Sequence, residues 1–292
     1  MRNIGVNFYG TKRRMYYDLE GVVQKLTECG VTSAELCIIF PPKRETEEDL
    51  KFKNTVDFKE VTGGIWEFQT AQERLDKVKN LGLRVISAQV MMGMTPDSGE
   101  VMKNLEKIKR FAKNNGLKYI VMNLAKNLED TKKYISMFNQ ITKELAEVGI
   151  TFVFHNHEVE LVDEAGTTAL DYIMENCPDL KLELDVGWVQ FAGKSPVEYI
   201  KKYQDRLVLL HLKDIVKDAG VHNRDNCFPA VGEGVLPLKE ILEAAENCGL
   251  DTDGIIIDQD NSFGDILEDI AVGVKNIKHC IALKNSWLLG LG

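Results

Sequence analysis

The sequence predicts a (β/α)8 barrel, and three of its features support this prediction. Short apolar runs alternate with longer amphipathic segments along the whole chain of 292 residues. Each apolar run is nearly continuous, which is typical of parallel strands that are buried on both faces of a sheet. A junction of helix, glycine and strand recurs, for example in NLGLRVIS, NNGLKYIV and EVGITFVF. Eight such units in strict alternation match the architecture of a closed barrel.

Eight ranges of the sequence have the length, the β-branched content and the hydrophobicity of buried strands. They are residues 3–9, 33–40, 84–92, 119–125, 151–157, 181–187, 207–214 and 254–260. The intervening helical patterns place apolar residues three and four apart, and several of them end on glycine or asparagine. These helices are predicted at 18–30, 66–82, 98–115, 130–148, 167–176, 195–204, 237–248 and 263–283.

A single domain is predicted over residues 1–292, because no linker or low-complexity stretch divides the chain. The alternative fold is a doubly wound open sheet, which usually has a glycine-rich phosphate-binding turn after its first strand. The corresponding turn here, NFYGTKRRM, contains a single glycine. The charged segment at 41–65 is predicted to form an extended loop over the barrel mouth, between the second strand and the second helix.

Composition and charge argue against several classes of protein. The net charge of −9 gives no support for a nucleic-acid-binding face, which needs clustered lysine and arginine. No stretch approaches the roughly 18 apolar residues of a transmembrane helix, and the first residues lack the pattern of a signal peptide. The six cysteines are scattered and form no CxxC pair, which favours free thiols. We therefore expect a cytoplasmic protein with no nucleic-acid or membrane partner.

Four polar residues stand at equivalent places, at the ends of the last four predicted strands. They are His155 in FVFHNHE, Asp185 in LELDVGW, His211 in LVLLHLKD and Asp258 in GIIIDQD. In a (β/α)8 barrel the C-terminal ends of the strands share one face, which carries the active site. Burying four such residues there without partners would be costly. The pattern therefore predicts a metal site, whose imidazole and carboxylate ligands suit Mn²⁺, Zn²⁺, Co²⁺ or Fe²⁺ better than Ca²⁺.

Each of these residues also has a simpler interpretation. A histidine at a strand end is more often a hydrogen-bonded polar residue than a metal ligand. Asp185 could instead cap the helix that follows its strand. Lys213 shares a strand face with His211 and could hold a substrate oxygen or the charge of an enediolate. Alternatively, this lysine could simply pair with Asp258 or Asp185.

Motifs along nearly the whole chain resemble the sugar phosphate isomerase/epimerase superfamily, also called xylose isomerase-like barrels. The motifs are HNHE on the fifth predicted strand, LDVGW and AGKSPVEYI after the sixth, HLKD on the seventh, and AVGEG before the last helix–strand unit. The superfamily includes inosose dehydratases, ketose epimerases and hydroxypyruvate isomerases. These motifs are fairly specific for the superfamily and poorly specific for a substrate.

The resemblance implies one divalent metal ion, most often Mn²⁺, held by Glu, Asp, His and Glu from strands five to eight. Asp185 and His211 match the middle two positions. Asp258 keeps the last carboxylate but shortens it by one methylene group, and His155 stands where many members carry the first glutamate. In ketose epimerases these two glutamates are thought to shuttle the proton. The two departures therefore put a two-carboxylate mechanism in doubt for this chain.

Neighbouring residues are assigned further roles. His157, two residues after His155, becomes the candidate base, because an imidazole titrates near neutral pH. Glu158 is an alternative ligand or catalytic group, and its other interpretation is an exposed loop carboxylate. Trp188 could form an apolar wall for a sugar ring, or it could have only a packing role. By resemblance, Glu233 in VGEGV helps to shape the pocket, although capping the next helix is an equal alternative.

The chemistry implied by the resemblance is removal of the proton next to a carbonyl, on a carbon that the metal ion acidifies. Return of the proton gives a sugar isomerase or epimerase, which is our leading hypothesis. Loss of a β-leaving group gives a lyase of the inosose dehydratase or keto-glycoside type, and the HNH motif favours this alternative. The expected substrate is a small sugar, keto-sugar or cyclitol. A homo-oligomer is a further expectation, because dimers and tetramers are common in such families.

Two other classes of protein are alternatives to a sugar-converting enzyme. Abasic-site nucleases of the endonuclease IV type share this barrel, but they need a three-metal cluster rich in histidine. Five histidines in an acidic chain do not suit that cluster or a DNA-binding face. A catalytically inactive binding or scaffold protein is the second alternative, and failure to bind any divalent ion would support it.

Overall fold

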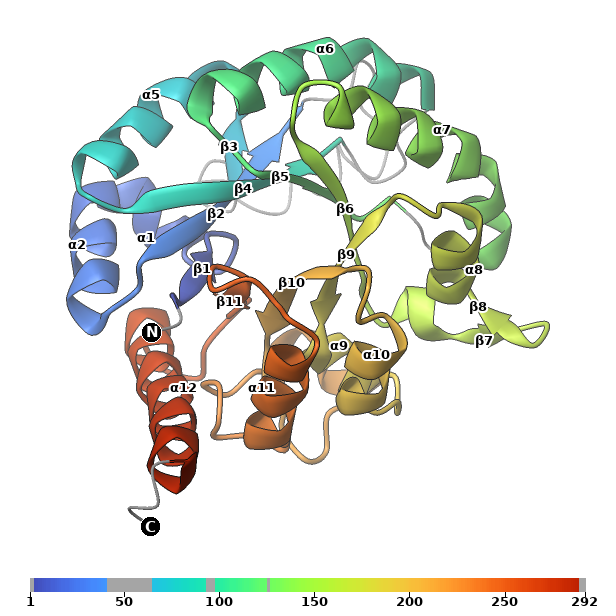
Figure 1. Ribbon diagram of the computed structural model, residues 1–292. Coiled ribbons are helices and arrows are strands. Elements are labelled where there is room, and N and C mark those ends of the chain that lie inside the picture. Colours follow the sequence, from blue (N-terminus) through green and yellow to red (C-terminus); the bar gives the residue numbers. More distant parts are fainter. Residues whose placement is uncertain (1–2, 41–64, 93–97, 125–126, 289–292) are drawn as a thin grey trace.

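Eight parallel strands close into a barrel, and a ring of helices surrounds it (Figure 1). The computed structural model describes residues 3–40, 65–92, 98–124 and 127–288. Within these residues the barrel strands are β1 (Gly5–Asn7), β2 (Ser33–Ile39), β4 (Arg84–Met91), β5 (Tyr119–Met122), β6 (Thr151–His155), β9 (Lys181–Asp185), β10 (Leu207–Leu212) and β11 (Ile255–Ile257). Each predicted strand range contains one of them, so the (β/α)8 barrel is confirmed.

The barrel closes at its first strand. β1 lies between β2 and β11 and pairs in parallel with both, so that Gly5 stands opposite Ser33 on one side and Ile256 on the other. A short additional strand, β3 (Ile65–Glu67), pairs with the later part of β2. Around the rest of the sheet β6, β9, β10 and β11 are successive neighbours. The C-terminal ends of these four strands therefore meet on one side of the barrel mouth.

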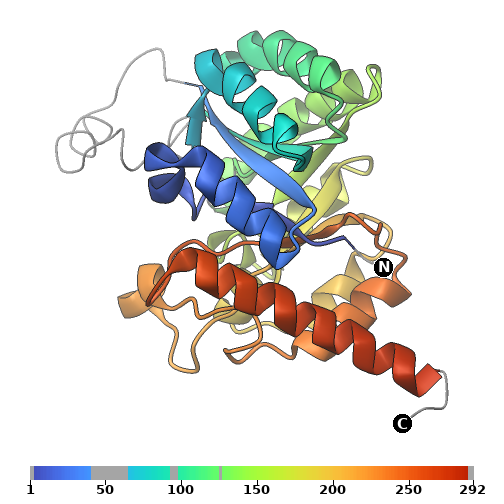
Figure 2. The same cartoon turned by 90° about the vertical axis from the view of Figure 1, so that its left-hand side faces the viewer.

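The helices that cover the barrel agree closely with the predicted ranges. They are α2 (Leu19–Cys29), α5 (Phe68–Asn80), α6 (Ser98–Asn115), α7 (Leu128–Ala146), α8 (Ala169–Asn176), α10 (Pro196–Lys202), α11 (Leu238–Asn247) and α12 (Ile266–Leu288). Helix α12 packs against α2, which completes the outer ring (Figure 2). Gly30 follows α2 with a φ of 101°, the left-handed geometry that often ends a helix. Among the described helices, none has the length and apolar character needed to cross a membrane.

Several short elements were not predicted, and all of them follow the C-terminal ends of strands. They are α1 (Lys12–Tyr17), the 3-10 turn η1 (Val159–Leu161), the hairpin of β7 (Asp163–Glu164) and β8 (Thr167–Thr168), α9 (Val186–Phe191) and the 3-10 turn η2 (Val221–Asn226). Such short segments do not show a helical period in the sequence. They build the side of the barrel that carries the mouth. The predicted extended loop at 41–65 lies outside the described residues, apart from Ile65 at the start of β3.

The interior of the barrel changes from apolar to polar toward the mouth. A buried apolar layer is formed by residues of five strands: Ile86, Val121, Val153, Leu209 and Ile256. Side chains two residues apart on a strand share a face. One step nearer the mouth, three of these strands therefore present His155, His211 and Asp258. The larger hydrophobic core lies outside the strands, between the barrel and its helices.

At the opposite end of the barrel, Asp253 joins the beginnings of several strands. Its carboxylate accepts hydrogen bonds from Asn3 Nδ2 at 2.6 Å, Arg84 Nη2 at 2.7 Å and Lys118 Nζ at 3.4 Å. Asp253 lies just before β11, whereas its three partners lie at or before the starts of β1, β4 and β5. The hydrogen bond from Arg84 outweighs burial and lowers the pKa of Asp253 to about 2.

We expect Asp253→Asn to lower the free energy of unfolding at neutral pH by about 1–2 kcal/mol, a modest value because Arg84 and Lys118 are half exposed. The folded pKa of about 2 lies below the ordinary value of 3.8. The carboxylate therefore contributes its full stabilisation at pH values above 3.8, the ordinary pKa of the unfolded state. This contribution disappears as the pH falls through about 2. Urea unfolding at neutral pH and near pH 3 measures it, and a mutational difference that does not shrink in acid would contradict this account.

Candidate metal centre

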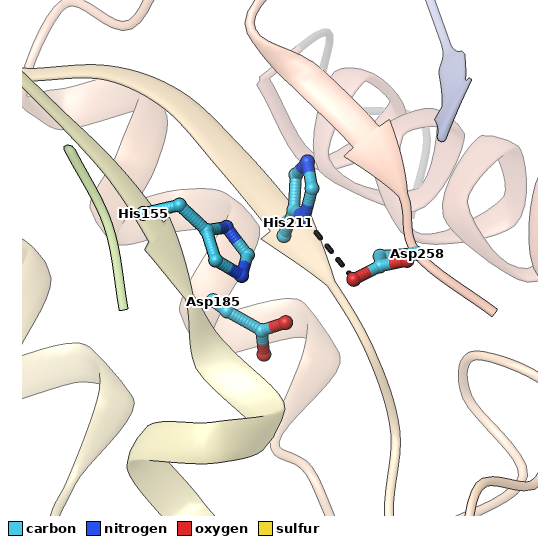
Figure 3. Close-up of side chains that lie close together, drawn as sticks. All are labelled: His155, Asp185, His211 and Asp258. Carbon is cyan, nitrogen blue, oxygen red and sulfur yellow. Dashed lines mark hydrogen bonds and ion pairs between the residues drawn. The ribbon is translucent and has the colours of Figure 1, made fainter. Parts of the chain in front are cut away.

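The four predicted ligands converge at the mouth of the barrel. His155, Asp185, His211 and Asp258 each offer one ligand atom, and these atoms lie within 4.8 Å of one another. All four residues are at least 95% buried, Asp258 being the most accessible at 5%. Figure 3 shows the two imidazoles and two carboxylates arranged around a common centre, from neighbouring strand ends. This donor set could hold a divalent ion of the Mn²⁺ or Zn²⁺ type.

A second layer of charged residues lies directly beneath this cluster. Glu183 stands two residues before Asp185 on β9, so both side chains point into the barrel. Glu35 from β2 lies at the same level and accepts a hydrogen bond from Asn7 Nδ2 at 2.7 Å. Both glutamates are fully buried. Neither glutamate is among the site residues predicted from the sequence, because each stands within an apolar strand.

Glu183 bridges the two histidines of the cluster. Its Oε2 atom lies 2.9 Å from His155 Nδ1, and its Oε1 atom lies 3.1 Å from His211 Nε2. Glu35 Oε1 also lies 3.0 Å from His211 Nε2. The opposite nitrogen of each ring, Nε2 of His155 and Nδ1 of His211, therefore remains for the cluster. Carboxylates behind ligand histidines commonly determine the ring orientation and tautomer in this way.

The lower layer could itself be considered a metal site, because ligand atoms of Glu35, Glu183 and His211 also lie within 4.8 Å of one another. The cavity at the barrel mouth distinguishes the two groups. Its lining includes His155 and Asp258 from the upper cluster, but neither Glu35 nor Glu183. A ligand entering from the mouth therefore meets the upper cluster first, and the two glutamates support it from behind.

Lys213 neutralises the carboxylates on the mouth side. Its Nζ atom lies 2.7 Å from Asp258 Oδ2, 2.7 Å from Asp260 Oδ2 and 3.1 Å from Asp185 Oδ2. The simpler interpretation of this lysine, pairing with Asp185 or Asp258, thus describes its contacts in this structure. Burial opposes its charge, but the three carboxylates outweigh burial and hold the pKa of Lys213 well above its ordinary value. It is a charged donor at neutral pH.

The pKa values of the two aspartates in the cluster shift in opposite directions. Burial raises the pKa of Asp185 to about 6, although Lys213 opposes the shift. Burial also acts to raise the pKa of Asp258, but the charges of Lys213 and His211 outweigh it and hold that pKa well below the ordinary range. The Oδ1 atom of Asp258 is buried and has no hydrogen-bond partner among the described residues. A buried acceptor of this kind fits a position that a cation completes.

Asp185 performs the capping role as well. Its Oδ1 atom accepts a hydrogen bond from the backbone N–H of Trp188 at 3.0 Å and so caps α9. Its other oxygen, Oδ2, is the one that faces Lys213. The two interpretations drawn from the sequence are therefore compatible, because each uses a different oxygen of the same carboxylate.

The cavity in front of the cluster has a volume of about 350 Å³. Five of the predicted site residues line it: His155, His157, Trp188, Lys213 and Asp258. The other lining residues are Tyr9, Lys12, Gln89, Met91, Asn123, Arg224, Asp225, Phe228, Asp260 and Asn261. Polar groups thus face aromatic rings across a space the size of a small-molecule site, which typically measures about 300–1,000 Å³.

His157, the predicted base, faces this cavity beside the cluster. Its ring centroid lies 4.9 Å from that of His155 and 5.8 Å from that of Trp188. Its backbone N–H donates to Glu160 Oε2 at 2.8 Å, which holds the turn after β6. Burial, with a smaller contribution from the charge of Lys213, lowers the pKa of His157 to about 4. The imidazole is therefore neutral at physiological pH, but it is a weaker base than one with the near-neutral pKa expected from the sequence.

Glu158 and Glu233 lie away from the cluster. Arg224 holds Glu158 in a two-pronged ion pair, with Nη2 of Arg224 at 3.0 Å from Glu158 Oε2. Glu233 is exposed and accepts a hydrogen bond from Asn276 on α12 at 3.2 Å. Neither glutamate lines the cavity. The arrangement gives no support to Glu158 as a ligand or to Glu233 as a pocket residue.

Trp188 combines its two predicted roles. It packs in a small apolar cluster with Ile215, Cys227 and Phe228, and it also lines the cavity. Its ring lies 4.9 Å from Lys213 Nζ and 4.5 Å from the guanidinium carbon of Arg224. Cations at these distances from an indole are attracted by its ring face. The tryptophan therefore holds two charged side chains at the cavity wall.

Close backbone packing explains two of the sequence motifs. In LDVGW, a Cβ atom on Gly187 would lie 2.5 Å from the carbonyl oxygen of Lys213, so only glycine fits there. In VGEG, a Cβ atom on Gly234 would lie 2.2 Å from Asp214 Oδ1. Asp214, the acid of HLKD, accepts hydrogen bonds from the backbone N–H groups of Gly234 at 3.0 Å and Leu236 at 3.1 Å. These motifs therefore join neighbouring loops at the mouth.

A (β/α)8 barrel with buried histidines and aspartates at its mouth has the architecture of the barrel enzymes, whose active sites lie at this face. Comparison with known proteins identifies the family. Residues 23–271 match the family described as xylose isomerase-like TIM barrel, and the chain belongs to this family. An inosose dehydratase of Lacticaseibacillus casei is 30% identical over 120 residues, which cover 36% of this chain and 39% of that protein. One from Clostridium botulinum is 28% identical over 166 residues, 52% of this chain and 55% of that protein.

Solved structures share the fold over nearly the full length. A sugar phosphate isomerase/epimerase from Parabacteroides distasonis superposes with a TM-score of 0.68 and 19% identity, covering 96% of this chain and 97% of the other. The IolI protein, whose crystal structure contains a bound zinc atom, has a TM-score of 0.65 and 13% identity over 98% of both chains. A probable 3-DHS dehydratase, AsbF of Bacillus anthracis, has a TM-score of 0.64 and 13% identity, covering 94% of this chain and 98% of that one.

We expect Glu183→Gln to weaken the binding of a divalent ion by about ten- to a hundredfold, because an amide cannot present a carboxylate oxygen to each of the two histidines. Titration calorimetry with Mn²⁺ or Co²⁺ measures the affinity. Glu158→Gln is the matched control, since that carboxylate is paired with Arg224 outside the cluster, and it should bind the ion as the unmodified protein does. Equal affinities of the Glu183 variant and the unmodified protein would contradict the bridging role.

Proposed function

We propose that the protein is a divalent-metal-dependent isomerase or epimerase that removes the proton next to a carbonyl of a small sugar. The observation that supports this proposal most directly is the convergence of two imidazoles and two carboxylates, of which His155 and Asp258 line the mouth cavity. His155, Asp185, His211 and Asp258 would hold the ion. The unpartnered Asp258 Oδ1 is the strongest sign that a cation belongs there.

A divalent ion at this position would act as a Lewis acid toward adjacent carbonyl and hydroxyl oxygens, making the carbon between them more acidic. Mn²⁺ is our first choice, because mixed imidazole and carboxylate donors suit it, and Zn²⁺, Co²⁺ and Fe²⁺ are alternatives. The zinc atom bound to the IolI protein makes zinc the main competitor. Metal analysis of the purified protein decides among them.

His157 is the proposed base. It faces the cavity, it lies beside His155, and its lowered pKa of about 4 leaves its ring unprotonated at neutral pH. Lys213 is the proposed donor to negative charge that develops on the substrate. Its ammonium group lies among Asp185, Asp258 and Asp260 at the cavity wall, where a charged donor stabilises an oxyanion more effectively than in water.

The cavity suits a small polyhydroxylated substrate. Trp188 and Phe228, whose ring centroids are 5.3 Å apart, line it with aromatic rings. Lysine, arginine, amide and carboxylate side chains on the remaining walls offer hydrogen-bonding groups for hydroxyls. A cavity of about 350 Å³ admits a single sugar or cyclitol rather than a long chain. We therefore propose a keto-sugar or keto-cyclitol as the substrate class.

A lyase is the second candidate function. Two observations favour it: the matched relatives are inosose dehydratases, and the strand-five ligand position is a histidine where a proton-shuttling glutamate would be expected. With one imidazole base facing the cavity, removal of one proton followed by loss of a β-leaving group needs no second carboxylate base. The same His157 and Lys213 would serve both reactions, so the two candidates differ only in the fate of the intermediate.

The test incubates the metal-loaded protein with keto-sugars and keto-inositols in D₂O. Deuterium incorporation into a substrate or its isomer, without loss of water or aglycone, supports the isomerase or epimerase. Release of water or an aglycone supports the lyase. A protein that binds a divalent ion and shows neither outcome with any member of the panel counts against both.

We expect His157→Ala to lower the rate of deuterium incorporation or elimination by at least about a hundredfold, because the proton acceptor is removed. The variant should keep its metal, since His157 lies outside the ligand cluster. Rate assays and metal analysis of the same sample check both statements. His222→Ala is the control, because that exposed histidine does not line the cavity. Loss of the metal from the His157 variant would show that the roles of His155 and His157 are reversed.

A further inference from the structure

The cavity wall opposite His157 is formed by residues that follow β1. In the order of the barrel strands, β1 and β6 are separated by three strands on each side, so they stand diametrically opposite in the barrel. His157 follows β6, and Tyr9 and Lys12 follow β1. All three residues line the cavity. A substrate beside the candidate metal cluster and His157 would therefore extend toward Tyr9 and Lys12.

Lys12 is held in place on this wall. Its Nζ atom lies 3.7 Å from the centroid of the Tyr9 ring, which is a close cation–π contact. The turn between the two residues is closed by a hydrogen bond from the Lys12 backbone N–H to the Tyr9 carbonyl oxygen at 3.3 Å. Tyr9 is in turn connected to the lower layer of the site, because its N–H donates to Asn7 Oδ1 at 2.7 Å. The lysine is thus positioned by the same elements that support the cluster.

Lys12 differs from the other two cations of the cavity in having no carboxylate partner. Lys213 lies within 3.1 Å of three aspartates. Arg224 is paired with Glu158 and with Asp225, whose Oδ1 atom is 3.0 Å from Nη1. In the described part of the chain, no carboxylate lies within ion-pair distance of Lys12. Among the carboxylates of the cavity, Asp260 has the largest effect on the pKa of Lys12. This aspartate, however, accepts a hydrogen bond from Lys213.

Both groups on this wall are hydrogen-bond donors. Burial, followed by the charge of Asp260, raises the pKa of Tyr9 to about 12, so its hydroxyl keeps its proton at neutral pH. Burial lowers the pKa of Lys12, since removal from water disfavours the ammonium form when no partner compensates. An anionic group placed beside this lysine would offset that cost.

We propose that Lys12 and Tyr9 form a binding subsite for an anionic group, a carboxylate or a phosphate, at the end of the substrate remote from the metal cluster. The proposal rests on the proposed function, because the metal cluster and His157 define the other end of the substrate. It narrows the substrate class to acidic keto-sugars or sugar phosphates. Lys12 would determine specificity and would take no part in the proton transfer.

The experiment compares matched neutral and acidic probes by titration calorimetry of the metal-loaded protein at constant ionic strength. D-fructose is the neutral probe, D-fructuronate carries a carboxylate, and D-fructose 6-phosphate carries a phosphate. The unmodified protein should bind at least one acidic probe about tenfold or more tightly than fructose. Lys12→Met should abolish this preference, because it should lower the affinity for the acidic probe far more than the affinity for fructose. The acidic probe that responds identifies the anionic group.

Two controls accompany the variant. Lys25→Met removes an exposed lysine on α2 that does not line the cavity, and it should retain the preference for the acidic probe. Lys12→Met should bind Mn²⁺ as the unmodified protein does, which shows that the cluster is intact. Equal affinities of the unmodified protein for acidic and neutral probes, no binding of any acidic probe, or a preference retained by Lys12→Met would each overturn the proposal. Probe binding without deuterium exchange would instead count against the proposed function.

Discussion

The balance of buried charge inside the barrel is the constraint on which the rest of the mouth depends. Glu35, Glu183, Asp185 and Asp258 are all buried, and isolated carboxylates cannot be kept charged at that depth. His211 contacts Glu35, Glu183 and Asp258, while Lys213 contacts Asp185, Asp258 and Asp260. These two residues from β10 and its end therefore hold together carboxylates from β2, β9 and the end of β11. The apolar layer below them separates the network from the opposite end of the barrel.

The contacts of this network explain how a histidine can occupy the first ligand position. By resemblance to the superfamily, a glutamate is expected at the position of His155. Here the carboxylate stands one strand away, because Glu183 is the strand partner of His155 and lies 2.9 Å from its ring. The imidazole thus reaches the cluster while its other nitrogen contacts a buried acid. The carboxyl group is kept in the site, although it has moved from the first layer to the second, where burial raises the pKa of Glu183 to about 8.

The fold and the upper cluster could be predicted because both follow from strict periodicities. Alternation along each strand determines which side chains point inward, and parallel strands bring their ends together, so His155, Asp185, His211 and Asp258 could be grouped from the sequence. Predicted strands ran too far at their C-terminal ends, because residues such as His157 and Asp260 are polar neighbours that turn out of the sheet. The short helix α9 gave no periodic signal, although its cap, Asp185, had been noted.

The remaining parts of the site depend on contacts that no local pattern reveals. Glu35 is a single acid within an apolar run, and its partner His211 is 176 residues away in the chain. Arg224 stands in a polar loop, and only the folded structure shows that it binds Glu158 and covers Trp188. Lys12 lies in the turn NFYGTKRRM, whose single glycine argues against a doubly wound open sheet but indicates no role for the lysine. Its importance comes from its position across the barrel from His157.

Closure of the barrel by β1 has a kinetic consequence. Asn3 and Asp253, which tie the two ends of the sheet together, are 250 residues apart, and β1 must enter between β2 and β11. Contacts of such long range form slowly, because the entropy of closing the chain is lost before they stabilise it. Until β11 pairs with it, β1 keeps an unpaired edge. We therefore expect the upper cluster, which includes Asp258 from the end of β11, to be completed late in folding.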